Sequence, residues 1–163
     1  MLSLRTTSQE HHAKLLPHVD RLAAIAEMIG REDCASIHVS FEEAYGVIVG
    51  QLVPHMDAIE TTLYAQLERL MGHRHSMAPM REEHRQMRRL IEVIGRYRVH
   101  VAGCRLGSVE ALALRRALYR LYSILKVHLA EEELYLGVLE QNLTDEEKDI
   151  LARGIDHANA QPL

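Results

Sequence analysis

"KVHLAEEELY", residues 126–135, lies in a long run that contains neither glycine nor proline and has the composition of a helix. His128 and Glu132 are four residues apart in this stretch. A helix therefore places both side chains on one face, with Cβ atoms roughly 5–6 Å apart. If that face is buried, two such polar groups are costly unless they pair or bind a metal. The stretch predicts a helix that carries polar chemistry.

Apolar residues recur at helical spacing along the rest of the chain, and no alternating strand pattern competes with them. We expect long helices over about 8–29, 36–71, 80–101 and 108–139, and a short helix over 144–155. Gly30 and Gly72 mark helix ends, and Pro54 near Gly50 predicts a kink. The predicted fold is all-α: an up-down-up-down antiparallel four-helix bundle with a short C-terminal helix, in one domain over residues 1–163.

The composition excludes several classes of protein. A formal net charge of −4 over 163 residues gives no basic surface for nucleic acid. No apolar stretch approaches the roughly 18 residues of a membrane span, and "MLSLRTTSQEHH" lacks the apolar segment of a signal peptide. Cys34 and Cys104 are too few for a disulfide scaffold. We therefore expect a cytoplasmic protein with reduced thiols, with neither nucleic acid nor membrane as a partner; a redox disulfide between the two predicted turns is the alternative.

The eleven histidines are the unusual feature of the composition, and four of them fall at matched heights. In an antiparallel pair of helices, residues equidistant from the turn lie level. The mean of 12 and 55 is 33.5, inside the predicted turn "GREDC", and the mean of 84 and 128 is 106, inside "GCRLG". The two hairpins can therefore bring His12, His55, His84 and His128 into one layer. Imidazoles with nearby carboxylates suit iron, manganese or zinc.

The histidine-bearing segments resemble the hemerythrin-like, or HHE cation-binding, family. They are "EHHAKLLPH" (10–18), "PHMDAIETTLY" (54–64), "REEHRQM" (81–87) and "HLAEEELY" (128–135), one in each predicted long helix. The resemblance implies a centre of two non-haem irons that acts on oxygen, peroxide or nitric oxide, or that senses iron. Carried over by position, it implies the metal ligands His12, His55, His84, His128 and Glu132.

Two positions depart from the family's pattern. Ile59 stands four residues after His55, where the pattern has a glutamate. Glu60 is the nearest substitute ligand, but it lies roughly 140° around a regular helix from His55. Met80 precedes His84 by four residues, where oxygen carriers have a second histidine. The expected site therefore has fewer ligands than an oxygen carrier.

Other residues are alternatives to these ligands. We consider His11 and His18 beside His12, and Glu133 beside Glu132, as alternative or second ligands. His18 and Tyr45 are also candidates to orient ligands through hydrogen bonds. Tyr64 is more often a packing residue than a ligand, and His73 and His75 are expected in a loop.

The expected function is redox chemistry on a small diatomic molecule or peroxide, since open coordination positions are where substrate binds. One rival is an iron or oxygen sensor or carrier without turnover. The other is a structural bundle that has lost its metal, with Ile59 as the first sign of decay.

Overall fold

A computed structural model describes residues 4–72 and 76–159, and the side chains of residues 8–10, 12–72 and 76–155 within them. The all-α prediction is confirmed: every regular element of the described chain is a helix. The first half contains α1 (Leu4–Met28), α2 (Cys34–Val47), η1 (Ile48–Leu52), α3 (Val53–Ile59), η2 (Glu60–Tyr64) and α4 (Ala65–Met71). The second half contains α5 (Ala78–Arg96), α6 (Arg98–Ala102), α7 (Ser108–Glu140) and α8 (Asp145–Asn159).

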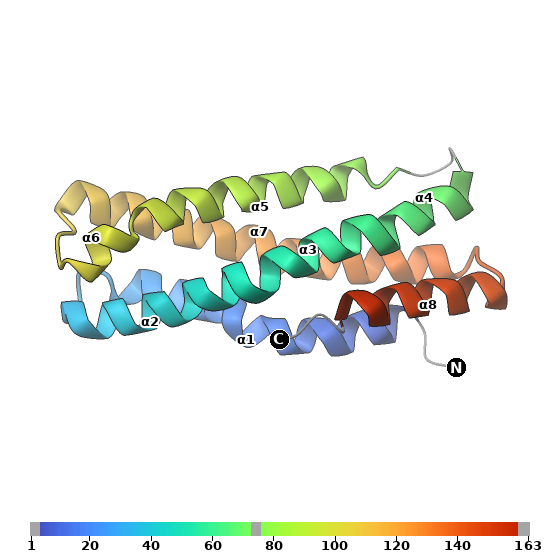
Figure 1. Cartoon of the computed structure of the whole chain (residues 1–163), viewed down its shortest axis with the longest axis horizontal. Helices are drawn as coiled ribbons and strands as arrows, with labels where there is room; N and C mark the ends of the chain where they lie inside the picture. Colours follow the sequence, from blue (N-terminus) through green and yellow to red (C-terminus); the bar gives the residue numbers. More distant parts are fainter. Residues whose placement is uncertain (1–3, 73–75, 160–163) are drawn as a thin grey trace.

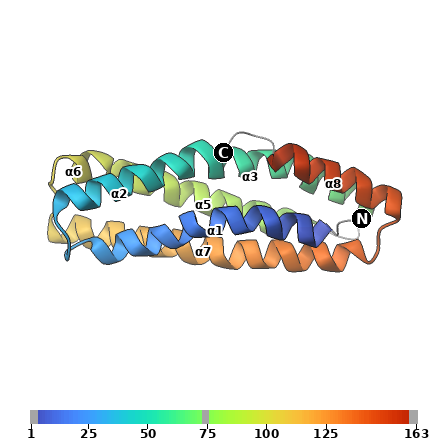
Figure 2. The same ribbon diagram turned by 90° about the horizontal axis from the view of Figure 1, so that it is seen from below.

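Successive long helical runs pass in opposite directions along one axis (Figure 1). Helix α7 packs against both α1 and α5, and α1 also packs against α2. Helix α8 folds back and packs beside α1 and the α3–η2 segment. Figure 2 shows α8 next to α3. None of the described helices is long and apolar enough to cross a membrane.

The second helical run is continuous from Cys34 to Met71 but irregular, which the sequence predicted as a kink near Pro54. The irregularity consists of two π-helical segments, η1 before α3 and η2 after it. Pro54 has no N–H, and its ring crowds the carbonyl of Gly50, so the wider π turn of η1 accommodates a disrupted hydrogen bond. His55 therefore lies on a short α-helical segment between two places where the helical register shifts.

The predicted third helix is interrupted. It was expected to run to about Val101, but α5 ends at Arg96 and the shorter α6 follows after Tyr97. The remaining predicted boundaries agree to within a few residues. Gly30 and Gly72 have positive φ angles of 86° and 59°, as helix-ending glycines do. The backbone N–H of Thr144 donates to the Glu147 carboxylate (2.7 Å), which forms a capping box before α8.

The expectation of reduced thiols is wrong. Cys34 and Cys104 form a disulfide with their Cα atoms 5.6 Å apart. Cys34 begins α2 and Cys104 lies between α6 and α7, so both belong to turns at the same end of the molecule. The sequence placed both cysteines at one end but could not determine whether their Cα atoms come within bridging distance.

The core has two apolar clusters that succeed each other along the axis. The larger lies toward the disulfide and includes Phe41, Met56, Met87 and Leu129. The smaller lies toward α8 and includes Ile59, Leu63, Tyr64, Met80 and Leu136. The buried histidines and Glu132 lie within a few residues of the points where α3, α5 and α7 pass from one cluster to the other. The polar layer is therefore closed by apolar side chains along both directions of the axis.

Candidate metal centre

The buried polar side chains of the described chain are few and come from every long helical run. They are Ser8, His12, His55, His84, His128 and Glu132, and none is more than 8% exposed. Five of these six residues are the ligands that the family resemblance implies by position. The structure therefore brings the four histidines and Glu132 into one buried layer.

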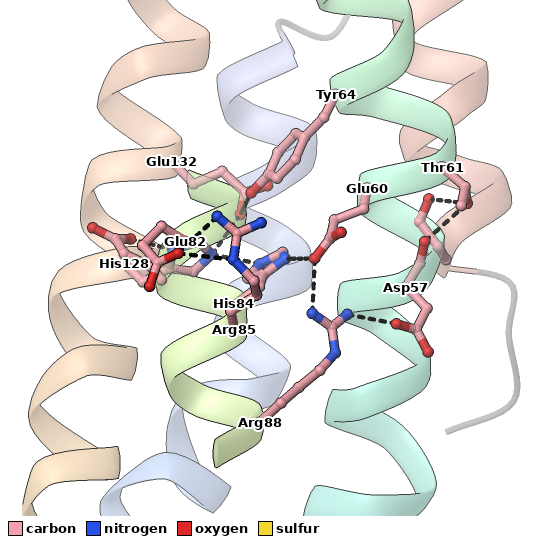
Figure 3. A network of polar contacts seen from close by, with 12 residues as sticks. Asp57, Glu60, Thr61, Tyr64, Glu82, His84, Arg85, Arg88, His128 and Glu132 are labelled. Atoms are coloured by element: carbon pink, nitrogen blue, oxygen red, sulfur yellow. Dashed lines mark hydrogen bonds and ion pairs between the residues drawn. The ribbon is translucent and has the colours of Figure 1, made fainter. Parts of the chain in front are cut away.

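The inward-facing nitrogens of this layer gather around Glu132. The Nε2 atoms of His84 and His128 are 3.0 Å apart, and the His128 Nε2 lies 3.5 Å from Glu132 Oε2. The Nε2 of His12 lies 3.9 Å from the same oxygen. Figure 3 shows His84, His128 and Glu132 converging between α5 and α7. Because His128 and Glu132 lie one regular turn apart on α7, their side chains meet as the i, i+4 spacing predicts.

The outward-facing nitrogens of three histidines each bond a different carboxylate. His12 Nδ1 donates to Glu133 Oε1 (3.0 Å), His84 Nδ1 to Glu60 Oε1 (2.7 Å) and His128 Nδ1 to Glu83 Oε2 (2.6 Å). A carboxylate accepts only, so Nδ1 carries the proton in each pair. This fixes the ring orientation and directs Nε2 inward, which is the arrangement that metal-binding histidines adopt in proteins.

The pKa values of the two contacting histidines, His84 and His128, are shifted in opposite directions. Burial, and then the neighbouring His128, lower the pKa of His84 to about 4, against the opposing effect of the hydrogen bond that His84 donates to Glu60. Burial also disfavours charge on His128, but Glu132 and Glu83 outweigh it and raise its pKa. The raised pKa of His128 and the lowered pKa of His84 assign His128 as the donor in the contact between the two Nε2 atoms. Both nitrogens of this contact face the centre of the layer.

Glu132 carries the negative charge of the interior. Burial alone would raise its pKa, but the hydrogen bond from His128 and attraction to His12 and His55 prevail, and the pKa falls to about 2. Tyr64 reaches the same carboxylate, with its hydroxyl 3.5 Å from Glu132 Oε2. Burial first, and then the Glu132 charge, raise the pKa of Tyr64 well above its usual range, so its phenol keeps its proton.

Glu60 lies outside the layer of inward-facing nitrogens. Its Oε1 accepts from His84 Nδ1 and from Arg88 Nη1 (3.0 Å), while Arg88 Nη2 bonds Asp57 (2.5 Å). Figure 3 shows this chain of contacts running from α5 across to α3. Burial opposes charge on Glu60, but Arg88 and His84 lower its pKa, so it stays ionised. Glu60, the predicted substitute ligand, thus accepts a hydrogen bond from the outer nitrogen of His84.

Ile59 and Met80, the two residues that depart from the family's pattern, both pack among apolar side chains. Ile59 is 2% exposed and belongs to the smaller cluster, together with Met80. One helical turn after His55, α3 therefore presents the apolar side chain of Ile59 in place of a carboxylate.

The structure places the alternative ligands in different surroundings. Glu133 bonds His12 Nδ1 from the outer side. His18 lines a small apolar pocket with Leu15 and Leu52, roughly 9 Å along α1 from His12. Tyr45 stacks on Phe41 with ring centroids 6.0 Å apart, in the larger cluster, away from the histidines. The side chain of His11, and His73 and His75 altogether, lie outside the described residues.

Two residues of the site, Glu83 and Ser8, did not emerge from the sequence as site residues, and a third, Tyr64, was expected to be a packing residue rather than a ligand. Glu83 bonds His128, the Ser8 Oγ lies 3.4 Å from His12 Nε2, and Tyr64 stacks its ring on His84 with centroids 5.6 Å apart. Glu83 could have been found, because the mean of 83 and 128 is 105.5, again inside the "GCRLG" turn. Ser8 carries no comparable signal, since it lies among ordinary helical residues.

The inner nitrogen and oxygen atoms of the layer contact one another. Within the described side chains, no three His, Cys, Asp or Glu residues are arranged as they stand to hold one ion. The contact between His84 and His128 and the contacts to Glu132 occupy the inner atoms. The types of donor and their outer carboxylates nevertheless match those of a metal centre of nitrogen and oxygen ligands.

Comparison with known proteins gives one match. No match was found among curated proteins or solved structures. The family model described as the hemerythrin HHE cation binding domain matches residues 6–152, which spans every histidine and carboxylate of the buried layer. The chain belongs to the hemerythrin HHE cation-binding family.

Proposed function

We propose that this chain binds two iron ions in the buried layer and uses them in redox chemistry on a small ligand: peroxide, nitric oxide or oxygen. The observation that carries the proposal is the set of three histidines whose Nδ1 atoms bond Glu133, Glu60 and Glu83. A structural histidine needs no such partner on one side and a buried carboxylate on the other. The proposed ligands are His12, His55, His84, His128 and Glu132.

The inner atoms fit such ions. An imidazole nitrogen binds a metal at about 2 Å. Two nitrogens on adjacent positions of one ion are then close to the 3.0 Å that separates His84 Nε2 from His128 Nε2. A metal ion would take the place of the proton now shared by those nitrogens, and the depressed pKa of Glu132 keeps its carboxylate ready as an anionic ligand.

When bound, iron supplies the one-electron redox chemistry that amino-acid side chains lack. The chain's own residues shape the surroundings. The apolar clusters above and below the layer exclude water, and Ile59 gives the site a hydrocarbon wall that suits a small neutral ligand. The protonated phenol of Tyr64 lies beside Glu132 and can donate a hydrogen bond there. With one inner carboxylate, the site keeps coordination positions for a ligand.

The decisive experiment is metal analysis with an ultraviolet–visible spectrum of the full chain expressed with iron. We expect close to two irons per chain and near-ultraviolet absorption from a bridged centre. Mixing with hydrogen peroxide or nitric oxide then separates turnover from binding: repeated consumption supports the enzyme, and a single reversible spectral change supports a sensor or carrier. One tightly bound zinc ion per chain would contradict the proposal.

A metal-free structural bundle is the second candidate, and one observation favours it. The inner atoms satisfy one another, since His128 bridges His84 and Glu132 without an ion. This candidate predicts that protein purified without metal cannot be reconstituted and melts at the same temperature with or without added iron. The iron-binding proposal predicts a higher melting temperature with iron, because the native state alone binds it.

A further inference from the structure

The Cys34–Cys104 disulfide lies far from the histidine layer and has a cavity of its own. Cys104 lies in the turn before α7, and His128 lies roughly 30 Å along α7 from Ser108, the first residue of that helix. A cavity of about 180 Å³ opens beside the disulfide, and both cysteines line it. Its other walls are mostly apolar: Ile29, Ile37, Val101, Leu106 and Ala111. An apolar cavity next to a sulfur–sulfur bond is a place where a small molecule can rest against that bond.

The two sulfurs have different surroundings. Cys104 is exposed, in the turn before α7, and its φ of +51° is a left-handed conformation that a residue other than glycine rarely adopts. Cys34 is partly buried at the first residue of α2, a helix of 14 residues. The N-terminus of α2 is already capped, because the Asp33 carboxylate accepts from the backbone N–H of Ser36 (3.0 Å). The difference in exposure sets the direction of exchange: an incoming thiolate reaches Cys104 more easily, and attack there makes Cys34 the leaving group.

We propose that this disulfide is an exchange site for a low-molecular-weight thiol with an apolar body, which the cavity holds. The thiolate attacks Cys104 Sγ, a new sulfur–sulfur bond forms there, and the Cys34–Cys104 bond breaks with Cys34 leaving as a thiolate. A second thiolate then attacks the external sulfur of the mixed disulfide. The products are the oxidised small-molecule disulfide and two protein thiolates, so two thiols supply the two electrons that reduce the protein.

The first test compares two uncharged thiols of similar acidity, phenylmethanethiol and 2-mercaptoethanol, as reductants of the oxidised full chain. Loss of the disulfide is followed by alkylation and intact mass. We expect phenylmethanethiol to be favoured by about tenfold in the folded protein relative to the same ratio in urea, where the cavity does not exist. Equal ratios in the folded and unfolded chain would overturn the proposal, as would purified protein that carries no disulfide.

Variants locate the preference in the cavity. Ala111→Phe fills the cavity from α7, whereas Val109→Phe adds the same ring at an exposed position of the same helix. Ala111→Phe should abolish the preference for phenylmethanethiol, and Val109→Phe should retain it. A preference that survives in Ala111→Phe would contradict the cavity as its source. If Ala111→Phe does not fold, the comparison in urea decides alone.

Peptide mapping identifies the attacked sulfur. With limiting phenylmethanethiol and an acid quench, the mixed disulfide should be found on Cys104, with Cys34 free. Predominant labelling of Cys34 would overturn the assigned direction of exchange. Since neither cysteine contacts the histidine layer, this result is independent of whether the chain binds iron.

Discussion

Two helical segments present a histidine to the same buried layer but differ in the residue one turn after it. On α7, His128 is succeeded at this spacing by Glu132, whose carboxylate lies 3.5 Å from the His128 ring. On α3, His55 is succeeded at the same spacing by the buried Ile59. Helix α7 is regular over 33 residues, whereas α3 has a π segment on either side. One segment contributes an anion and the other contributes hydrocarbon.

The difference redistributes charge around the histidines. Glu132 is the buried carboxylate of the described chain, while Glu60, Glu83 and Glu133 are only partly buried and contact the outer nitrogens. The phenol of Tyr64, at the end of η2, comes to within hydrogen-bond reach of Glu132. The helical run that contains α3 therefore contributes an uncharged donor, the Tyr64 phenol, whereas α7 contributes the negative charge of Glu132. An inner layer with one anion holds cations less strongly and leaves more room for a neutral ligand.

The largest expected effect comes from removing the α7 anion. Glu132→Gln keeps the shape of the side chain but not its charge, and iron affinity should fall by at least about 100-fold. The exposed Glu131→Gln is the matched control and should keep its iron. Iron content after dialysis against a chelator measures both. Equal retention in the two variants would remove Glu132 from the proposed ligands.

The same substitution should destabilise the metal-free protein. The folded pKa of Glu132, about 2, lies below its ordinary value of 4.5, so ionisation stabilises the fold. The shift corresponds to about 3 kcal/mol. This contribution is present above pH 4.5 and is lost as the pH falls toward 2. Urea denaturation of metal-free wild type and Glu132→Gln at pH 6 and at pH 3 should therefore show a difference that shrinks at the lower pH.

The second prediction makes α3 resemble α7. Ile59→Glu restores the carboxylate that the family's pattern has, and we expect iron affinity to rise by about tenfold while turnover of peroxide or nitric oxide falls, because an open position is filled. The metal-free variant should lose about 3 kcal/mol, since a carboxylate is buried without a partner. Ile59→Gln is the control for shape. No gain in iron with Ile59→Glu would mean that Ile59 does not face the ions.

Much of this comparison could be predicted from the sequence. Helical periodicity and short turns determine which residues are level, so His12, His55, His84 and His128 could be placed in one layer from their numbers alone. The i, i+4 spacing on a regular helix placed Glu132 beside His128. These inferences depend only on helix geometry and turn position, which the chain encodes locally.

The residues behind the histidines could not be predicted in the same way. Assigning Glu60 required the path of η2, and π segments have no clear sequence signature beyond a nearby proline. The contact between Glu133 and His12 depends on how α1 and α7 rotate against each other, which packing decides. The disulfide likewise required two turns to approach within bonding distance, a consequence of the whole fold.

The third prediction tests the outer carboxylate on the η2 segment. Glu60→Gln leaves His84 in place but removes the charge behind its ring, and iron affinity should fall by about tenfold. Asp57→Asn, the control, removes the other Arg88 partner without touching a histidine. Titration of the metal-free protein with ferrous iron gives both affinities. A complete loss of iron in Glu60→Gln would instead make Glu60 a ligand.

The fourth prediction separates the two touching histidines by pH. In metal-free protein, nuclear magnetic resonance should show His128 protonating above its usual 6.5 and His84 remaining neutral down to about 4. Iron must displace the His128 proton, so iron affinity should fall between pH 7 and 6, by no more than about tenfold for one displaced proton. Glu83→Gln removes one cause of the raised pKa and should reduce that slope. Identical titration of both rings would contradict the assigned proton.

The smallest expected effect concerns Tyr64, the α3-side counterpart of the missing carboxylate. Its contact with Glu132 is long at 3.5 Å, and burial and the nearby anion keep its phenol protonated, so it contacts the carboxylate as a weak donor. Tyr64→Phe keeps the packing against His84 and should lower iron affinity by no more than about threefold. Tyr122→Phe on α7 is the control. Loss of most of the iron in Tyr64→Phe, together with loss of a visible phenolate–iron absorption band, would mean that the metal deprotonates Tyr64. The α3 side would then supply an anionic ligand after all, through a phenol at the end of η2 in place of a carboxylate at residue 59.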